Sequence, residues 1–393
     1  MYVNIYERLD DIIRPTLIVE VKDRLGTIIR RDVVKTGSWV RNFAEALMAA
    51  FSQQERTVIR EDGNSAKIKG YLHKDLTWAC KNLTYNATLL AADAGAGDDS
   101  YGIVVGSGSD PEDFEQYALS SKITHGSGSG QLEYGSMNFT VTDPLNFALK
   151  RAFTNYSGGD IQITEVALVV HWYAYINVDG TVYDDENVKF MILRTLLSEP
   201  VTVPDGGSVT VTISIQLAGS LTDNFGLVFR SMFSLEEVTV TDINGNNVTV
   251  AGGIRDYTED LKDSYCYLRK TVLNGDGPPA NDKRGIVIGA SNLAFTSSQY
   301  NLQDKYTKDT FDHEEGRVYT LEELSDKVRI KVTRTFVNIS GGAKDIYEFG
   351  LICWLNLRKY GTIFLISRIV LDTPITVGDG DGITINYYIA IPK

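Results

Sequence analysis

The feature that most constrains this chain is a block of sequence that occurs twice. Residues 151–168 and 334–351 share Arg, Phe, Asn, Ser-Gly-Gly, Ile, Glu and Leu at matching places, with a constant offset of 183 (334 − 151). Each block alternates up to Phe-x-Asn, reaches Ser-Gly-Gly and alternates again. This pattern predicts a β-hairpin, because glycine tolerates the positive φ angles of tight turns. The chain is therefore expected to contain two copies of one β-rich unit.

Shorter matches extend both copies beyond the hairpin. Residues 102–106 and 285–289 read Gly-Ile-Val-Val-Gly and Gly-Ile-Val-Ile-Gly, again at an offset of 183 (285 − 102). Residues 194–203 and 368–377 match at an offset of 174 (368 − 194). Several blocks at nearly constant offsets indicate an internal duplication rather than chance similarity.

The offsets also locate the expected length differences between the copies. Residues 238–245 match 19–26, a hairpin with Asp and Gly in its turn, at an offset of 219 (238 − 19). The first copy would then carry 36 extra residues (219 − 183) in a weakly structured arm at about 52–98. It would carry nine more (183 − 174) in an acidic loop at 177–187, since insertions belong in loops.

Short consecutive strands separated by turn signals, without helical crossovers between them, predict antiparallel sheets. We predict an all-β dominated fold: two tandem antiparallel β-sandwiches, jelly-roll-like, over 1–218 and 219–393, each with a minor helix. An immunoglobulin-like sandwich is the alternative, although nothing resembles its Cys…Trp…Cys pattern. In the first copy Ser38 is the expected helix N-cap. The expected apolar face of this helix comprises Val40, Phe43, Ala44, Leu47 and Phe51.

Composition narrows the function classes. The net charge of −13 argues against nucleic-acid binding, which needs clustered Lys and Arg. Cys80, Cys266 and Cys353 are odd in number and lack metal-ligand spacing, so we expect buried thiols in a reducing compartment. The first residues do not read as a signal peptide. The longest apolar run, 166–176, is far shorter than the roughly 20 residues of a membrane span. We expect a soluble protein made in a cytoplasm, without a membrane partner.

The residues that could carry chemistry form no recognisable site. The histidines are scattered, and none has a partner at metal-ligand spacing: His73, His125, His171 and His313. Neither a Gly-x-Ser-x-Gly elbow nor a phosphate-binding loop occurs. Carboxylates gather at 184–186 and 378–382; calcium binding is one reading, but turn chemistry explains them better. We therefore predict no enzyme activity, no cofactor, and no catalytic, cofactor-binding or metal-binding residues.

Two glutamates recur inside the repeated hairpin. Glu165 and Glu348 fall in separate copies, which does not suit a glycosidase, whose two carboxylates must face one cleft. The simpler hypothesis is that each glutamate contacts an arginine within its own sandwich. The candidates are Arg151 or Arg194 in the first copy and Arg334 or Arg368 in the second.

The repeated pattern also carries a family resemblance. It runs Arg-x-Phe-x-Asn-x-Ser-Gly-Gly, Ile-x-Glu-x-x-Leu, and then a closing Thr-Val-Thr-Ile strand, and Gly-Ser-Trp-Val-Arg-Asn-Phe at 37–43 fits with it. Over most of both copies it resembles the β-rich structural proteins of tailed bacteriophage particles. The resemblance implies a virion protein, on the capsid, neck or tail, that forms a homo-oligomer and contacts other virion proteins. It carries over no functional residues, because the shared residues look like folding determinants.

Two expectations concern how such a subunit would make contacts. The arm at 52–98 and the N-terminal strand are expected to reach a neighbouring subunit and add to its sheet. The alternative function is a receptor- or carbohydrate-binding virion module, with Trp172, Tyr173 and Tyr175 stacking on sugars. The competing interpretation of these three aromatic residues is packing in a core or an interface.

Overall fold

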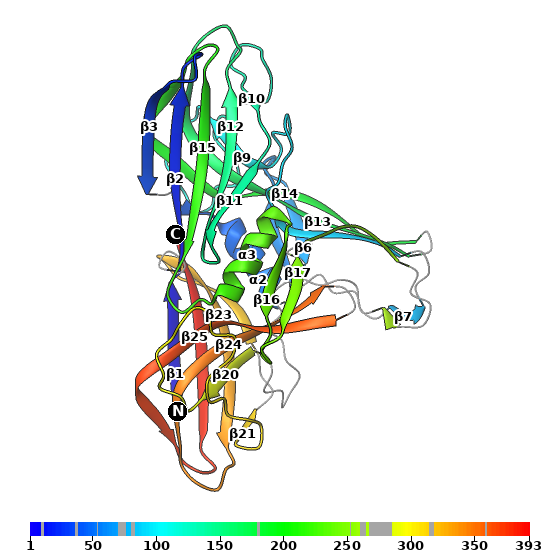
Figure 1. Ribbon diagram of the computed structural model, residues 1–393, viewed down its shortest axis with the longest axis vertical. Coiled ribbons are helices and arrows are strands. Elements are labelled where there is room, and N and C mark those ends of the chain that lie inside the picture. Colours follow the sequence, from blue (N-terminus) through cyan, green and yellow to red (C-terminus); the bar gives the residue numbers. More distant parts are fainter. Residues whose placement is uncertain are drawn as a thin grey trace.

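The computed structural model describes all residues except 9–11, 36, 37, 53, 70–75, 80–82, 179, 180, 252, 260–264, 267–284, 314–317, 358 and 359. The described part is dominated by strands and contains two α-helices, α2 (Arg41–Ser52) and α3 (Asp223–Ser234). Figure 1 shows two sandwich-like bodies along the long axis, with the helices near their junction. The predicted all-β dominated class is confirmed.

Two sheets build the upper body in Figure 1. One contains β2 (Ile13–Lys22), β3 (Ile28–Lys35), β10 (Glu133–Tyr134), β11 (Asn138–Asp143), β12 (Asn146–Thr154) and β15 (Ser208–Leu217). The other contains β4 (Ser38–Trp39), β8 (Leu83–Ala91), β9 (Gly102–Gly106), β13 (Ile161–Val178), β14 (Thr181–Val203) and β18 (Gly253–Glu259). β15 alternates strictly along its length, burying its Val and Ile side chains and leaving Ser and Thr partly exposed.

The lower body has the same arrangement with fewer strands. One sheet contains β1 (Tyr2–Arg8), β21 (Phe311–His313), β22 (Val318–Glu323), β23 (Lys327–Asn338) and β26 (Gly382–Pro392). The facing sheet contains β20 (Gly285–Gly289), β24 (Lys344–Leu357) and β25 (Tyr360–Val377). Three small ribbons complete the described strands. They pair β5 (Glu55–Ile59) with β6 (Ser65–Lys69), β16 (Glu237–Thr241) with β17 (Asn247–Ala251), and β7 (Leu76–Ala79) with β19 (Tyr265–Cys266).

A helix followed by a hairpin recurs in both copies, at an offset of 182 (224 − 42). The amide of Asn42 donates to Ile59 O at 2.8 Å and accepts from Ile59 N at 2.9 Å. Asn224 makes the same two bonds with Thr241, at 2.7 and 2.9 Å. The structural counterpart of residues 238–245 is therefore 56–63.

The predicted match of residues 238–245 to 19–26 at offset 219 is thus wrong. Both segments form β-hairpins that alternate and then turn at Asp and Gly, and this local pattern does not identify which hairpin it belongs to. The true counterpart, Arg-Thr-Val-Ile-Arg-Glu-Asp-Gly at 56–63, has a more divergent sequence.

The two predicted insertions change with this correction. The described part of 52–98 is not a weakly structured arm: β5 and β6 pack on α2, and β8 lies within a sheet. The backbone of Gly95 and Asp98 accepts hydrogen bonds from buried Arg151, so this segment belongs to the first body. The predicted acidic loop at 177–187 is instead mostly strand, because β13 and β14 stay paired out to Val178 and Thr181.

The helices lie between the two copies and are buried by both. α2 contacts β5, β6 and β14 of the first copy and β22 and β23 of the second. α3 contacts β8 of the first copy and β16, β17 and β25 of the second. Ser38 is not the N-cap that the sequence predicted, because it lies in β4 opposite Arg194 and α2 begins only at Arg41. The expected apolar face of α2 is buried where its side chains are described, and so are Ala46, Ala49 and Ala50 on its other sides. A helix buried all round needs small residues where neighbours approach closely, and these alanines provide them.

Strands also cross between the copies. β1, at the start of the chain, pairs with β26 in the lower body, in parallel register from Tyr2–Thr384 to Arg8–Ala390. β18, which follows the second helix and hairpin, pairs with β8 of the first copy. The predicted boundary between 1–218 and 219–393 therefore divides the repeat in sequence but does not separate two independent bodies.

One apolar core runs through both copies, including Phe43 and Ile213 as well as Phe336 and Ile385. We therefore predict that the chain unfolds in a single cooperative transition, because neither copy has a complete core or sheet without the other. Calorimetry and circular dichroism should give coincident transitions, and a chain that ends at residue 218 should not fold. Two resolved transitions would contradict the prediction.

Candidate functional site

The repeated glutamates form buried ion pairs, as the sequence suggested. Glu165 Oε2 lies 2.7 Å from Arg194 Nη2 and 2.9 Å from its Nε, and both side chains are at most 1% exposed. Glu348 Oε2 lies 2.6 Å from Arg368 Nε, and both side chains are fully buried. The choice between two arginines in each copy is thereby settled in favour of Arg194 and Arg368.

The Glu165 carboxylate is fully occupied by the fold. It accepts backbone N–H bonds from Gly108 at 3.0 Å, Ser120 at 3.2 Å and Ser121 at 2.9 Å. Burial alone would raise the pKa of Glu165, but the bonds from Ser121, Arg194 and Ser120 outweigh it and hold the pKa below its usual range. A Cβ at position 106 or 108 would come within 2.6 Å of the carboxylate, so this loop requires glycine.

The second copy repeats this arrangement with fewer hydrogen bonds. Glu348 accepts from the backbone of Gln303 at 3.2 Å and Asp304 at 2.9 Å, and Arg368 donates to Gln299 Oε1 at 2.9 Å. In the first copy, Arg194 Nη2 also donates to Ser120 Oγ at 3.1 Å. Arg368 Nη2 is buried and has no hydrogen-bond partner among the described residues. The second ion pair is therefore less completely hydrogen-bonded than the first.

The other two arginines tie strands together through backbone carbonyls. Arg151 donates to Gly135 O at 2.8 Å and Tyr101 O at 3.0 Å, and its guanidinium lies 4.8 Å from the ring centre of Tyr134. Burial lowers the pKa of Arg151, although nearby Tyr134 and Asp98 oppose the shift. In the second copy Arg334 donates to Ile286 O at 2.9 Å. These side chains act in folding.

The Asn-x-Ser-Gly-Gly turns make matching hydrogen bonds in the two copies, but the predicted β-hairpins are wrong. β12 and β13, on either side of the first turn, lie in different sheets and pair with other strands, and so do β23 and β24 around the second turn. Each turn therefore carries the chain from one sheet to the facing sheet, because alternation and Ser-Gly-Gly mark a tight turn but do not tell which strands pair. Asn155 donates to Gly159 O and Val203 O, both at 2.8 Å, and Asn338 donates to Gly342 O and Val377 O at the same distances. The middle glycines have φ of 81° and 78°, as the sequence predicted for a turn. An aspartate from the following turn holds each of these turns in place. Gly158 N donates to Asp205 Oδ1 at 2.9 Å, and Gly341 N donates to Asp379 Oδ1 at 2.8 Å.

Within the described residues, no group of three or more His, Cys, Asp or Glu could hold a metal ion. His125 accepts a bond from Tyr134 N at 3.1 Å, and His171 Nε2 lies 2.9 Å from Asn187 Oδ1. His313 is buried in the second copy, and His73 lies outside the described residues. The described histidines therefore sit on separate elements: a loop, β13 and β21.

Of the remaining candidates, Trp172 and Cys353 are core residues. Trp172 is fully buried near Phe190, so it offers no platform for a sugar, and that part of the carbohydrate hypothesis is wrong. It points inward because β13 alternates, whereas Tyr173 is half-buried. Cys353 is a free, fully buried thiol whose pKa is raised by burial. The side chains of Tyr175, Cys80 and Cys266 lie outside the described part.

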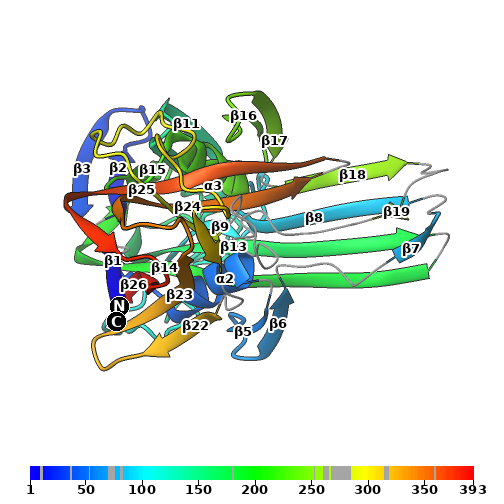
Figure 2. The ribbon, with the colours of Figure 1, turned by 90° about the horizontal axis from the view of Figure 1, so that it is seen from below.

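Two surfaces stand out from this scaffold, and both are made of strands. The first is a sheet that projects away from the two bodies, formed by the outer parts of β8, β13, β14 and β18 (Figure 2). Its register places Tyr85 opposite both Ile176 and Tyr257. Among the described residues, the outer part of β14 pairs with β13 alone, so its other edge is open.

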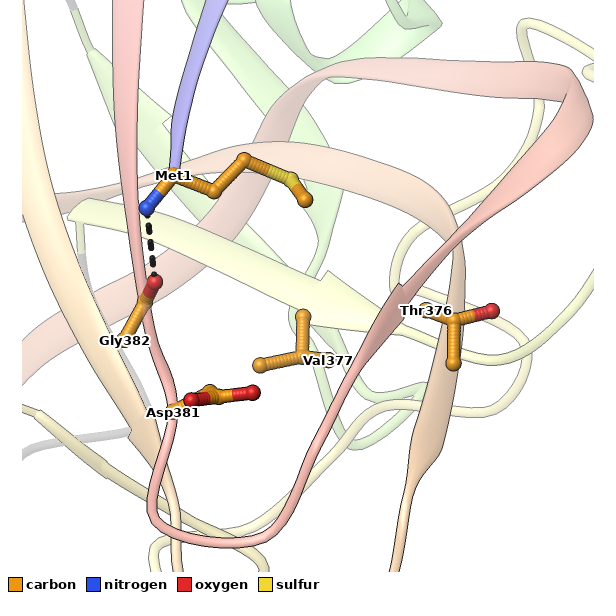
Figure 3. A pocket seen from close by; sticks show the side chains of 5 residues that line it. All are labelled: Met1, Thr376, Val377, Asp381 and Gly382. Carbon is orange, nitrogen blue, oxygen red and sulfur yellow. Dashed lines mark hydrogen bonds between the residues drawn. The ribbon is translucent and has the colours of Figure 1, made fainter.

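The second surface is the junction of β1 with β26. A hollow of about 350 Å³ lies at its start, lined by Met1, Thr376, Val377, Asp381 and Gly382 (Figure 3). The Met1 nitrogen donates to Gly382 O at 3.0 Å, and Thr384 N donates to Met1 O at 2.8 Å. The alternation Tyr-Val-Asn-Ile-Tyr at 2–6 signals a strand, but nothing local in the sequence identifies β26 as its partner.

Compared with known proteins, the chain matches no family model, no curated protein and no solved structure. The described helices are too short or too polar to cross a membrane. Function must therefore be inferred from the chain itself. The two strand surfaces, the projecting sheet and the β1–β26 junction, are its candidate functional sites.

We predict that Glu165→Gln destabilises the protein by about 3–5 kcal/mol, the usual cost of leaving one partner of a buried ion pair uncompensated. The matched control is Glu199→Gln, on the exposed part of β14, which should change stability by less than about 0.5 kcal/mol. Denaturant unfolding monitored by circular dichroism measures both. Equal stability of the two variants would contradict the structural role of the ion pair.

The lowered pKa of Glu165 also predicts acid sensitivity. The contribution of the ionised carboxylate is complete above its unfolded-state pKa of about 4.3 and is lost as the pH falls through the lower folded-state pKa. The stability difference between the native chain and Glu165→Gln should therefore shrink from neutral to acidic pH. A difference that stays constant across that range would contradict this account.

Proposed function

We propose that this chain is a non-enzymatic structural component of a tailed-bacteriophage particle, on the capsid, neck or tail, which forms a homo-oligomer. In this proposal its two units are jelly-roll-like, and its other partners are virion proteins. The observation that carries the proposal is the projecting sheet, whose outer β14 edge is open among the described residues. Open edges and exposed sheet faces pair readily with neighbouring chains, so such a sheet suits a protein that works in contact with others.

The contacts of the repeated residues support a scaffolding role. Glu165, Arg194 and Asn155 direct their polar atoms to partners within the fold, and their counterparts in the second copy do the same with fewer bonds at Arg368. What the duplication preserves is thus a set of folding contacts. This favours a structural subunit, which acts through its shape and its contacts.

The sequence of the projecting strands supports an interface. Tyr85, Tyr175, Tyr183 and Tyr257 all fall on them, and tyrosine is enriched at protein–protein interfaces. The net charge of −13 favours protein partners over nucleic acid. The repeated sequence block resembles phage structural proteins, and this suggests the virion as the place where these contacts form.

We predict that shortening the β13–β14 hairpin abolishes self-assembly. Residues 175–185 are removed, and Ala174 is joined to Glu186 through Asn-Gly, which makes a two-residue hairpin turn. The body should remain folded, because the deletion keeps the described buried residues of both strands, Trp172 and Ala174 on β13 and Val188 onward on β14. Sedimentation velocity should show an oligomer for the native chain and a monomer for the variant.

The control is Leu25→Ser, which lies in an exposed turn of the first body and should sediment as the native chain does. Melting of the shortened variant near the native temperature verifies that its body is intact. A shortened variant that still forms the native oligomer would show that the projecting sheet is not the assembly surface.

A further inference from the structure

We propose that the edge of β26 is a strand-acceptor groove, and that in the assembled particle it binds β1 from a second copy of this chain. This inference deepens the proposed assembly function and rests on it: the exchange takes place between copies that the projecting sheets have brought together, so a variant without those sheets stays monomeric. In the structure the chain's own β1 fills the groove, which shows that a parallel strand with this sequence fits it. The proposal concerns which copy supplies that strand.

The edge of β26 needs a strand. Its Ile385 and Tyr387 are buried core residues, and Asn386 is only 7% exposed. The Asn386 amide donates to Asn4 Oδ1 on β1 at 3.0 Å, while its oxygen accepts from Thr333 Oγ1 on β23 at 2.9 Å. Without β1, this buried amide and the β26 backbone ladder would lose their partners, at the cost of unsatisfied polar groups.

Among its described residues, the second copy has no local strand for this position. In the first copy, β2 pairs with β15 in antiparallel register and is covered on its far side by β3. At the repeat offset of 182, the counterpart of β2 would begin at residue 195 (13 + 182), and that segment is already part of β14. The groove is therefore filled in parallel by a segment 382 positions away in sequence.

β1 is attached in a way that suits exchange. In the part of the chain that the structure describes, it pairs with β26 alone and lies at the end of its sheet. Val3 and Ile5 pack toward the apolar core, but among the described β1 side chains only Ile5 counts as buried, at 8% exposure, and Tyr2 is 78% exposed. Only residues 9–12 separate β1 in one body from β2 in the other. An edge strand with a single neighbour can be exchanged between identical chains without new contacts, which is domain swapping.

Cysteine cross-linking between separate chains tests the source of the strand. Tyr2 and Thr384 are register partners, so Tyr2→Cys is placed in one chain and Thr384→Cys in another with a tag of different length. Cys80 and Cys266 are replaced by serine in both, while buried Cys353 is kept. The two chains are co-expressed, oxidised and separated without reductant. The inference predicts a cross-linked heterodimer that carries both tags.

Two controls accompany this experiment. The double variant Tyr2→Cys/Thr384→Cys in dilute solution verifies that the two positions can form the bond. Leu25→Cys paired with Thr384→Cys should give no heterodimer, because Leu25 lies in an exposed turn of the first body.

Absence of the heterodimer would overturn the inference, because β1 would then be fixed within its own chain. If the native chain nonetheless sediments as an oligomer, assembly uses another surface and the proposed function stands without strand exchange. A heterodimer that forms equally with Leu25→Cys would also overturn the inference, because the cross-link would not depend on the groove.

Discussion

The structure depends on one constraint: a sheet edge that carries core residues must be paired or covered. Neither copy of the repeat meets this constraint alone. The lower body takes β1 from the start of the chain to cover β26, and the upper sheet takes β18 from the second copy beside β8. Because strands cross in both directions, the helices between the copies are enclosed and one apolar core runs through the molecule. The duplicated chain is therefore a single folding unit.

Within each copy, buried polar residues fix how the loops meet the strands. The Glu165–Arg194 pair anchors the loop after β9 to the long β13–β14 hairpin, and Glu348–Arg368 does the same in the second copy. Glycine is required beside both carboxylates, since a Cβ at position 106 or 289 would lie within 2.6 Å of them. The asparagine turns carry the chain from one sheet to the facing sheet in each copy. A buried ion pair contributes little net stability, so its role here is to select one arrangement of strands.

Much of this fold can be predicted from sequence because its signals are local. Alternation and Ser-Gly-Gly identify the strands and the turns between them, the apolar spacing identifies α2, and the duplication singles out Glu165 with two candidate arginines. What could not be predicted is non-local. The partner of β1 lies at the far end of the chain, and the 238–245 hairpin was assigned to the wrong counterpart because Asp-Gly turns look alike. For Trp172 the sequence left sugar stacking and core packing open, because alternation alone does not tell which face of β13 is inward, and its burial confirms core packing.

We propose that the strand surfaces of this chain join it to copies of itself. The most direct test is the light-scattering mass of the native protein across concentration. A closed oligomer of defined subunit number, formed reversibly as concentration rises, is the predicted result. A monomer at every concentration would contradict self-assembly, and would favour instead a decoration or receptor-binding module that acts on a surface built by other proteins.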